Sequence, residues 1–96
     1  MRHREPTIEE LAASLTALSR RAVDAYAPLV EGIVVDRCQD VRHIERTLDG
    51  LLDFCFDPEA LNLYKTLWRY YHAIDPAAAA YFANAYREHW DAEPQA

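Results

Sequence analysis

Apolar side chains recur at intervals of three and four residues over the first third of the chain, a pattern typical of an amphipathic helix. Thr7 and Glu10 have the spacing of a capping box, which predicts that this helix begins at Ile8. Pro28 lies inside the pattern, and proline removes a hydrogen bond within a helix. We therefore expect a break or sharp kink at residues 26–28. The members of the stripe are Ile8, Leu11, Leu15, Leu18, Ala22, Ala25 and Leu29.

A second helix is predicted to start at Pro28 or Leu29 and to extend as far as Phe56. The later part of this segment carries apolar residues at helical spacing. Gly32 and Gly50 lie within it and weaken it, so a further kink is consistent with the pattern. The apolar residues are Val41, Ile44, Leu48, Leu51, Leu52 and Cys55.

One helix-start signal occurs twice, at Asp57-Pro58 and at Asp75-Pro76. Aspartate accepts hydrogen bonds from the free N–H groups of the first turn, and proline suits the first helical position. Helices are therefore predicted over 58–73 and 76–91, folded back as a tight hairpin. The fold class is all-α, a small four-helix bundle or paired helical hairpins. We expect one domain over 7–91, a disordered lead-in at 1–6 and a loose tail at 92–96.

Composition and charge narrow the classes of function. The chain of 96 residues is 51% hydrophobic with only two glycines, which favours a folded helical domain. Its net charge is −6, and residues 47–96 carry 3 basic groups against 8 acidic ones. This balance disfavours direct nucleic-acid binding and would suit a basic protein partner. No segment is apolar enough for a signal peptide or a membrane span, so we expect a cytoplasmic protein.

Large aromatic side chains are concentrated in the predicted hairpin. They widen the apolar arc of the third helix to about 180°, whereas a surface helix with one core face needs about 100°. The rings could all belong to the core of the monomer. We favour the second interpretation, in which part of the arc forms a homodimer or partner interface, where Tyr and Trp are enriched. The candidate interaction residues are Tyr64, Trp68, Tyr71, Tyr86 and Trp90.

Carboxylates recur every four residues at Glu45, Asp49, Asp53 and Asp57. Most rows of this kind are solvated faces of helices, and Asp57 also has a separate role as an N-cap. The functional interpretation is that the first three form an acidic ridge that docks a partner rich in arginine and lysine.

Candidate chemistry is sparse elsewhere. Asp36, Asp40 and His43 would share one face of a continuous helix and could contribute ligands to a metal site in a bundle. Cys38 and Cys55 have no zinc-like spacing, and we expect buried free thiols. No phosphate loop or nucleophile motif is present, so no catalytic residue and no cofactor is predicted.

These observations favour a non-enzymatic protein-interaction module, a small regulator, adaptor or inhibitor that presents an acidic, aromatic-rich helical surface. The alternative is a helical bundle that binds a small ligand or a metal through Asp36, Asp40 and His43.

Overall fold

The computed structural model describes residues 5–90, and helix accounts for 84% of this part of the chain. Four helices and no strand are present in it, which confirms the predicted all-α class and the four-helix bundle. The helices are α1 (Ile8–Val35), α2 (Val41–Leu52), α3 (Pro58–Ile74) and α4 (Pro76–Trp90). Residues 1–4 of the predicted lead-in, residue 91 and the whole predicted tail at 92–96 lie outside the described residues.

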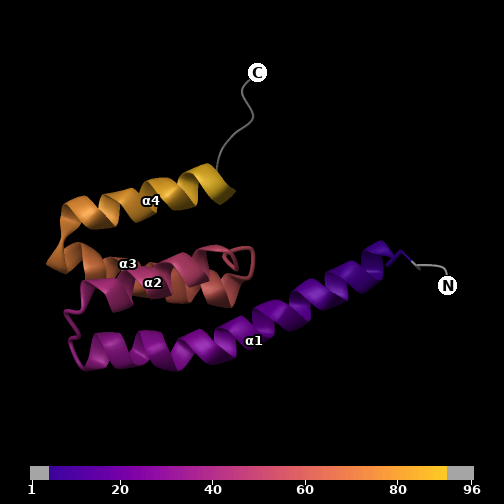
Figure 1. The fold of residues 1–96 in the computed structure, drawn as a ribbon, viewed down its shortest axis with the longest axis horizontal. Helices are drawn as coiled ribbons and strands as arrows, with labels where there is room; N and C mark the ends of the chain where they lie inside the picture. Colours follow the sequence, from indigo (N-terminus) through magenta and orange to yellow (C-terminus); the bar gives the residue numbers. More distant parts are fainter. Residues whose placement is uncertain (1–4, 91–96) are drawn as a thin grey trace, which may run out of the picture.

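Helix α3 is the centre of the molecule, because α1, α2 and α4 each pack against it. Figure 1 shows α4 folded back on α3 and α1 running along the opposite edge of the bundle. The fully buried side chains come from all four helices and form one core, consistent with a single hydrophobic centre. The residues without exposed surface are Ile44, Leu48, Leu51, Ala60, Leu67, Tyr71 and Ala79.

Helix α1 is continuous through Pro28, so the predicted break at residues 26–28 is wrong. Pro28 has no N–H to donate to the carbonyl oxygen of Asp24, one turn earlier. Both Asp24 and Pro28 are exposed, and that carbonyl can therefore be hydrated. The proline removes one hydrogen bond on the solvent-exposed face of the helix, and the hydrogen bonds on the packed face are kept.

The chain instead breaks between Val35 and Val41, so a single helix from residue 28 or 29 to residue 56 is also wrong. Arg37 adopts a left-handed conformation with φ of 51°. The amide of Cys38 donates to the carbonyl oxygen of Ile33 at 2.9 Å, and the amide of Arg37 donates to that of Val34 at 3.3 Å. This pair of bonds is a Schellman motif, which normally has glycine where Arg37 stands.

Three of the four predicted helix starts are confirmed, those of α1, α3 and α4. The Thr7 hydroxyl accepts from the Glu10 amide at 3.1 Å, and the Glu10 carboxylate accepts from the Thr7 amide, completing the capping box. Asp57 accepts from the Glu59 amide at 2.8 Å to begin α3. Asp75 accepts from the Ala78 amide at 3.1 Å, and so one residue both ends α3 and begins α4. The predicted end of the fourth helix at residue 91 lies outside the described residues.

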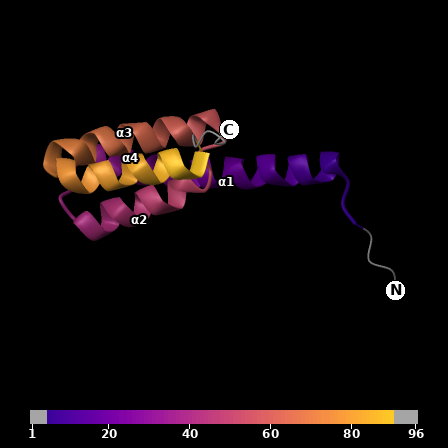
Figure 2. The same ribbon diagram turned by 90° about the horizontal axis from the view of Figure 1, so that it is seen from above.

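The N-terminal part of α1 extends beyond the bundle. Figures 1 and 2, at right angles to each other, both show it projecting past the other three helices. The first buried residue of α1 is Ser19, and every residue from 8 to 18 is exposed. The radius of gyration of 15.8 Å exceeds the roughly 12 Å expected of a compact domain of this size. We call residues 8–18 the projecting half of α1.

Candidate interaction surfaces

The five predicted aromatic interaction residues are divided between the core and the surface. Tyr64 and Tyr71 are buried. The Tyr64 hydroxyl donates to the carbonyl oxygen of Phe82 at 2.8 Å, and the Tyr71 hydroxyl donates to Glu45 Oε2 at 2.7 Å. The pKa of Tyr71 is raised to about 12, mainly by burial and to a smaller extent by the hydrogen bond to Glu45. These two rings therefore belong to the monomer core.

Of the five predicted residues, only Trp68, Tyr86 and Trp90 retain exposed surface and could contribute to a partner surface. Each ring is nevertheless held in place. The Trp68 indole donates to the carbonyl oxygen of Ala79, and Tyr86 lies against Tyr64 with ring centroids 6.0 Å apart. Trp90 is 37% exposed, and its indole donates to the carbonyl oxygen of Leu52 at 2.6 Å.

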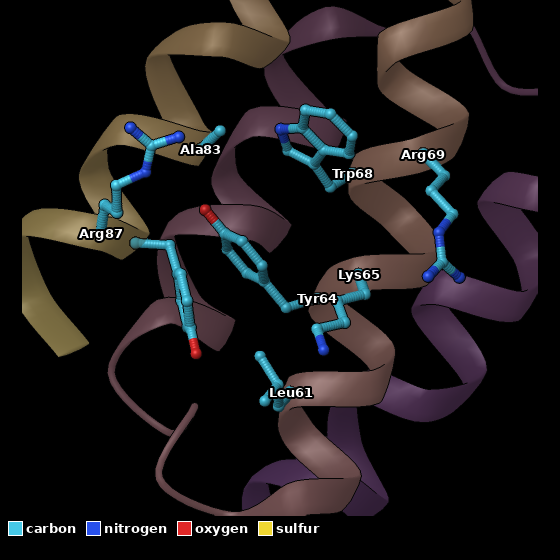
Figure 3. Close-up of a pocket in the computed structure, with 8 residues that line it drawn as sticks. Leu61, Tyr64, Lys65, Trp68, Arg69, Ala83 and Arg87 are labelled. Carbon is cyan, nitrogen blue, oxygen red and sulfur yellow. The ribbon is translucent and has the colours of Figure 1, made fainter. Parts of the chain in front are cut away.

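A hollow of about 370 Å³ lies between α3 and α4. Figure 3 shows Tyr64 and Trp68 on its floor, with Leu61 at one end and Ala83 on the α4 wall. We call it the α3–α4 hollow. Its full lining is Leu61, Tyr64, Lys65, Trp68, Arg69, Ala83, Tyr86 and Arg87.

Three cations are among the residues that line the α3–α4 hollow. Lys65 and Arg69 come from α3 and Arg87 comes from α4, and all three are exposed. They are the 3 basic residues of positions 47–96. Within residues 5–90 none of them forms a salt bridge, whereas Arg20 pairs with Glu59 at 3.1 Å. The sequence shows that these cations are few, but their position at one hollow depends on how α4 packs against α3.

The acidic row on α2 is formed, but part of it has an internal role. Glu45 is half-buried, and its carboxylate accepts a hydrogen bond from the Tyr71 hydroxyl. The pKa of Asp49 is raised, mainly by partial burial and to a smaller extent by the negative charges of Glu45 and Asp53. Asp49 therefore lies within the electrostatic influence of both neighbouring carboxylates of the row. Asp57 is separate, because it caps α3 and its pKa is lowered by hydrogen bonds from the Ser19 hydroxyl and the Glu59 amide.

Asp36, Asp40 and His43 do not share one helix face, so that premise of the metal interpretation is wrong. Asp36 ends α1, whereas Asp40 is the N-cap of α2 and accepts from the His43 amide at 3.3 Å. The intervening turn at Arg37 separates them into two helices. In the described part of the chain, no group of three or more His, Cys, Asp or Glu side chains could hold a metal ion. Cys55 is buried, as predicted, and burial raises the pKa of its thiol to about 12, while Cys38 is half-buried.

The sequence predicts the apolar stripe on α1, but it does not show that the stripe is exposed. Ile8 is 84% exposed, and Leu11, Leu15 and Leu18 are each about half exposed at 49%, 52% and 50%. Leu29, farther along the same stripe, is 42% exposed. The stripe thus forms a contiguous apolar strip along the projecting half of α1, which is uncommon on monomeric proteins unless a partner covers it.

Comparisons with protein-family models, with curated proteins and with solved structures find no match for this chain. Among residues 5–90, no helix combines the length and the apolar character that crossing a bilayer requires. The candidate interaction surfaces of the chain are the apolar strip on α1 and the α3–α4 hollow.

Proposed function

We propose that this chain is a non-enzymatic protein-interaction module whose docking element is the projecting half of α1, and that a second copy of the chain covers it. The observation that carries the proposal is the uncovered apolar strip on residues 8–18. The projecting half continues the packed part of α1, which supplies its nucleus, but its own 11 residues bury little apolar surface. Most of the stability of such a helix in proteins comes from burial of its apolar face, so this segment needs an external partner.

The spacing of the strip supports pairing with another helix. Its members Ile8, Leu11, Leu15 and Leu18 follow intervals of three, four and three, and Ala22, Ala25 and Leu29 continue the alternation. This is the a/d repeat of a coiled coil, in which each apolar side chain inserts between four residues of a facing helix.

The composition of the segment supports self-association. Residues 11–19 contain no charged side chain, so two copies can approach without like-charge repulsion. Alanines and serines lie beside the leucines and allow the backbones to come close. The bundle begins at Ser19, so a parallel pair would bring two bundles to the same end of the helices. An antiparallel two-fold arrangement places them at opposite ends and closes the assembly at two subunits.

Charge insertion tests the proposal. The double substitution Leu11→Glu/Leu15→Glu places two carboxylates in the strip. Its control, Ala13→Glu/Ala17→Glu, places the same charges at the same spacing on the other side of the same helix. Sedimentation equilibrium should give twice the 11.1 kDa chain mass for the unmodified protein and for the control. The leucine variant should sediment as a monomer, with circular dichroism verifying that the bundle is still folded.

Two results would contradict the proposal. One is an unmodified protein that remains a monomer at concentrations of about 100 μM, well above the Kd of a specific dimer. The other is a leucine variant that still sediments as a dimer. This result would place the interface on another surface, such as the one that contains Trp68, Tyr86 and Trp90.

A further inference from the structure

We propose that the α3–α4 hollow is a second, independent binding site, and that it takes an acidic peptide segment of a partner protein. One large apolar side chain of that segment would occupy the aromatic floor. Aspartate or glutamate residues on either side of it would pair with Lys65, Arg69 and Arg87. This site goes beyond the self-association proposed for α1, because it involves different helices and a ligand of different chemistry.

The charge distribution identifies the ligand as anionic. The second half of the chain has 8 acidic residues, yet its 3 basic residues all line one hollow. Lys65 and Arg69 are one turn apart on α3, and Arg87 stands on the α4 side, as Figure 3 shows. None of the three has a salt-bridge partner within residues 5–90. Cations that are unpaired within the described residues, beside an apolar floor, favour a partner with complementary carboxylates, since charge complementarity selects partners and speeds encounter.

The floor of the hollow is already formed in the free protein. The Trp68 indole donates to the carbonyl oxygen of Ala79 at 2.6 Å, and the Tyr64 hydroxyl donates to that of Phe82 at 2.8 Å. Both bonds cross from α3 to the backbone of α4, so they fix the ring positions and the distance between the helices. Binding to a rigid floor costs little side-chain entropy, which favours affinity.

Ala83 keeps the hollow open. Its short side chain lies on the α4 wall, opposite the α3 rings in Figure 3. A larger residue at this position would project into the space that we assign to the apolar side chain of the ligand. The substitution Ala83→Leu is therefore a steric block that changes no charge on the rim.

Size and surroundings favour a peptide over the other anionic ligands. A volume of about 370 Å³ is at the lower end for a small-molecule site, and such sites bury most of their ligand. Here the cations are exposed around the rim, so a ligand would keep one side in water, as a peptide with a single anchoring side chain does. A nucleic-acid backbone would meet the acidic surface of the same half of the chain.

The binding experiment uses synthetic peptides and the full chain. The probe is a seven-residue peptide with a central phenylalanine and three glutamates on each side. One control peptide has lysines in place of the glutamates, and a second has alanine in place of the phenylalanine. Titration is followed by amide and indole NMR signals, with the Trp68 indole as the reporter on the floor. We expect saturable shifts at Trp68 and its neighbours on α3 and α4 with the probe, and much weaker binding of both controls.

Variants then test the rim and the floor separately. The double substitution Lys65→Glu/Arg87→Glu should weaken binding of the probe about tenfold or more, as expected when two attractive pairs become repulsive. The matched control Arg42→Glu/Arg46→Glu makes the same change in net charge on α2 and should have a much smaller effect. Ala83→Leu should abolish binding while the bundle remains folded.

Several outcomes would overturn the proposal. An equal loss of affinity in the α2 control would mean that only the net charge of the protein matters. Strong binding of the lysine peptide would mean that the hollow does not select an anionic ligand. If the probe does not bind but an aromatic carboxylate such as indole-3-acetate shifts the same signals, the site is a small-molecule site instead. Dimer formation through α1 is measured separately by mass, so failure of either proposal leaves the other testable.

Discussion

The two glycines of the chain are predicted to respond in opposite ways to the same substitution. Gly32 lies in α1 and Gly50 in α2. Replacing glycine by alanine inside a helix normally stabilises it by about 0.8–1 kcal/mol, because alanine loses less backbone entropy on folding. A Cβ at Gly32 would meet nothing within 4 Å, so Gly32→Ala should show this full gain.

Gly50 has a different environment. A Cβ there would overlap the Tyr26 hydroxyl and lie 2.6 Å from Cζ and 3.1 Å from Cε1 of the same ring. Tyr26 is packed against the core, so the ring can move only by giving up part of that packing. Overpacking of this kind costs about 1–3 kcal/mol, which equals or exceeds the gain in helix propensity. Gly50→Ala should therefore unfold about 1–3 kcal/mol more easily than Gly32→Ala.

Urea unfolding followed by circular dichroism measures both variants, and melting temperatures should differ by about 4–8 °C for each kcal/mol in a domain of this size. A double-mutant cycle locates the cause. In a Tyr26→Ala background the added Cβ no longer meets the ring, so Gly50→Ala should become stabilising. If Gly50→Ala stabilises the unmodified protein as much as Gly32→Ala does, the close approach of α1 and α2 at this point is refuted.

Two further predictions concern the α1–α2 turn and the buried titratable groups. Arg37→Gly should stabilise the protein by about 0.5–1 kcal/mol in urea unfolding, because glycine adopts the left-handed conformation of Arg37 without steric cost; no gain would argue against the Schellman motif. The contribution of Cys55 and Tyr71 to stability should be fully present below about pH 9 and be lost as the pH rises toward 12, because burial raises the pKa of Cys55 from 9.0 and of Tyr71 from 10.0 to about 12 in the folded state. Unfolding curves at several pH values should show this loss, and Tyr71→Phe should remove the part that comes from Tyr71.

The sequence by itself determined the elements whose signals are local. The capping box at Thr7 and the N-caps at Asp57 and Asp75 each act within one turn of helix, so their residues suffice to place the starts of α1, α3 and α4. The four-helix class followed from the same signals and from the apolar periodicity. The break between α1 and α2 was missed because its capping motif has Arg37 where glycine usually marks the position.

Tertiary structure decided which side of each helix is covered. Pro28 is tolerated because its missing hydrogen bond faces water, and this depends on which side of α1 packs against α2 and α3. Periodicity shows that Leu15 and Tyr71 lie on apolar faces, but not that one is half exposed while the other has no exposed surface. The convergence of Lys65 and Arg87 on one hollow depends on the antiparallel packing of α4 on α3. Such outcomes depend on helix lengths and contacts between residues distant in sequence, whereas a cap depends only on its immediate neighbours.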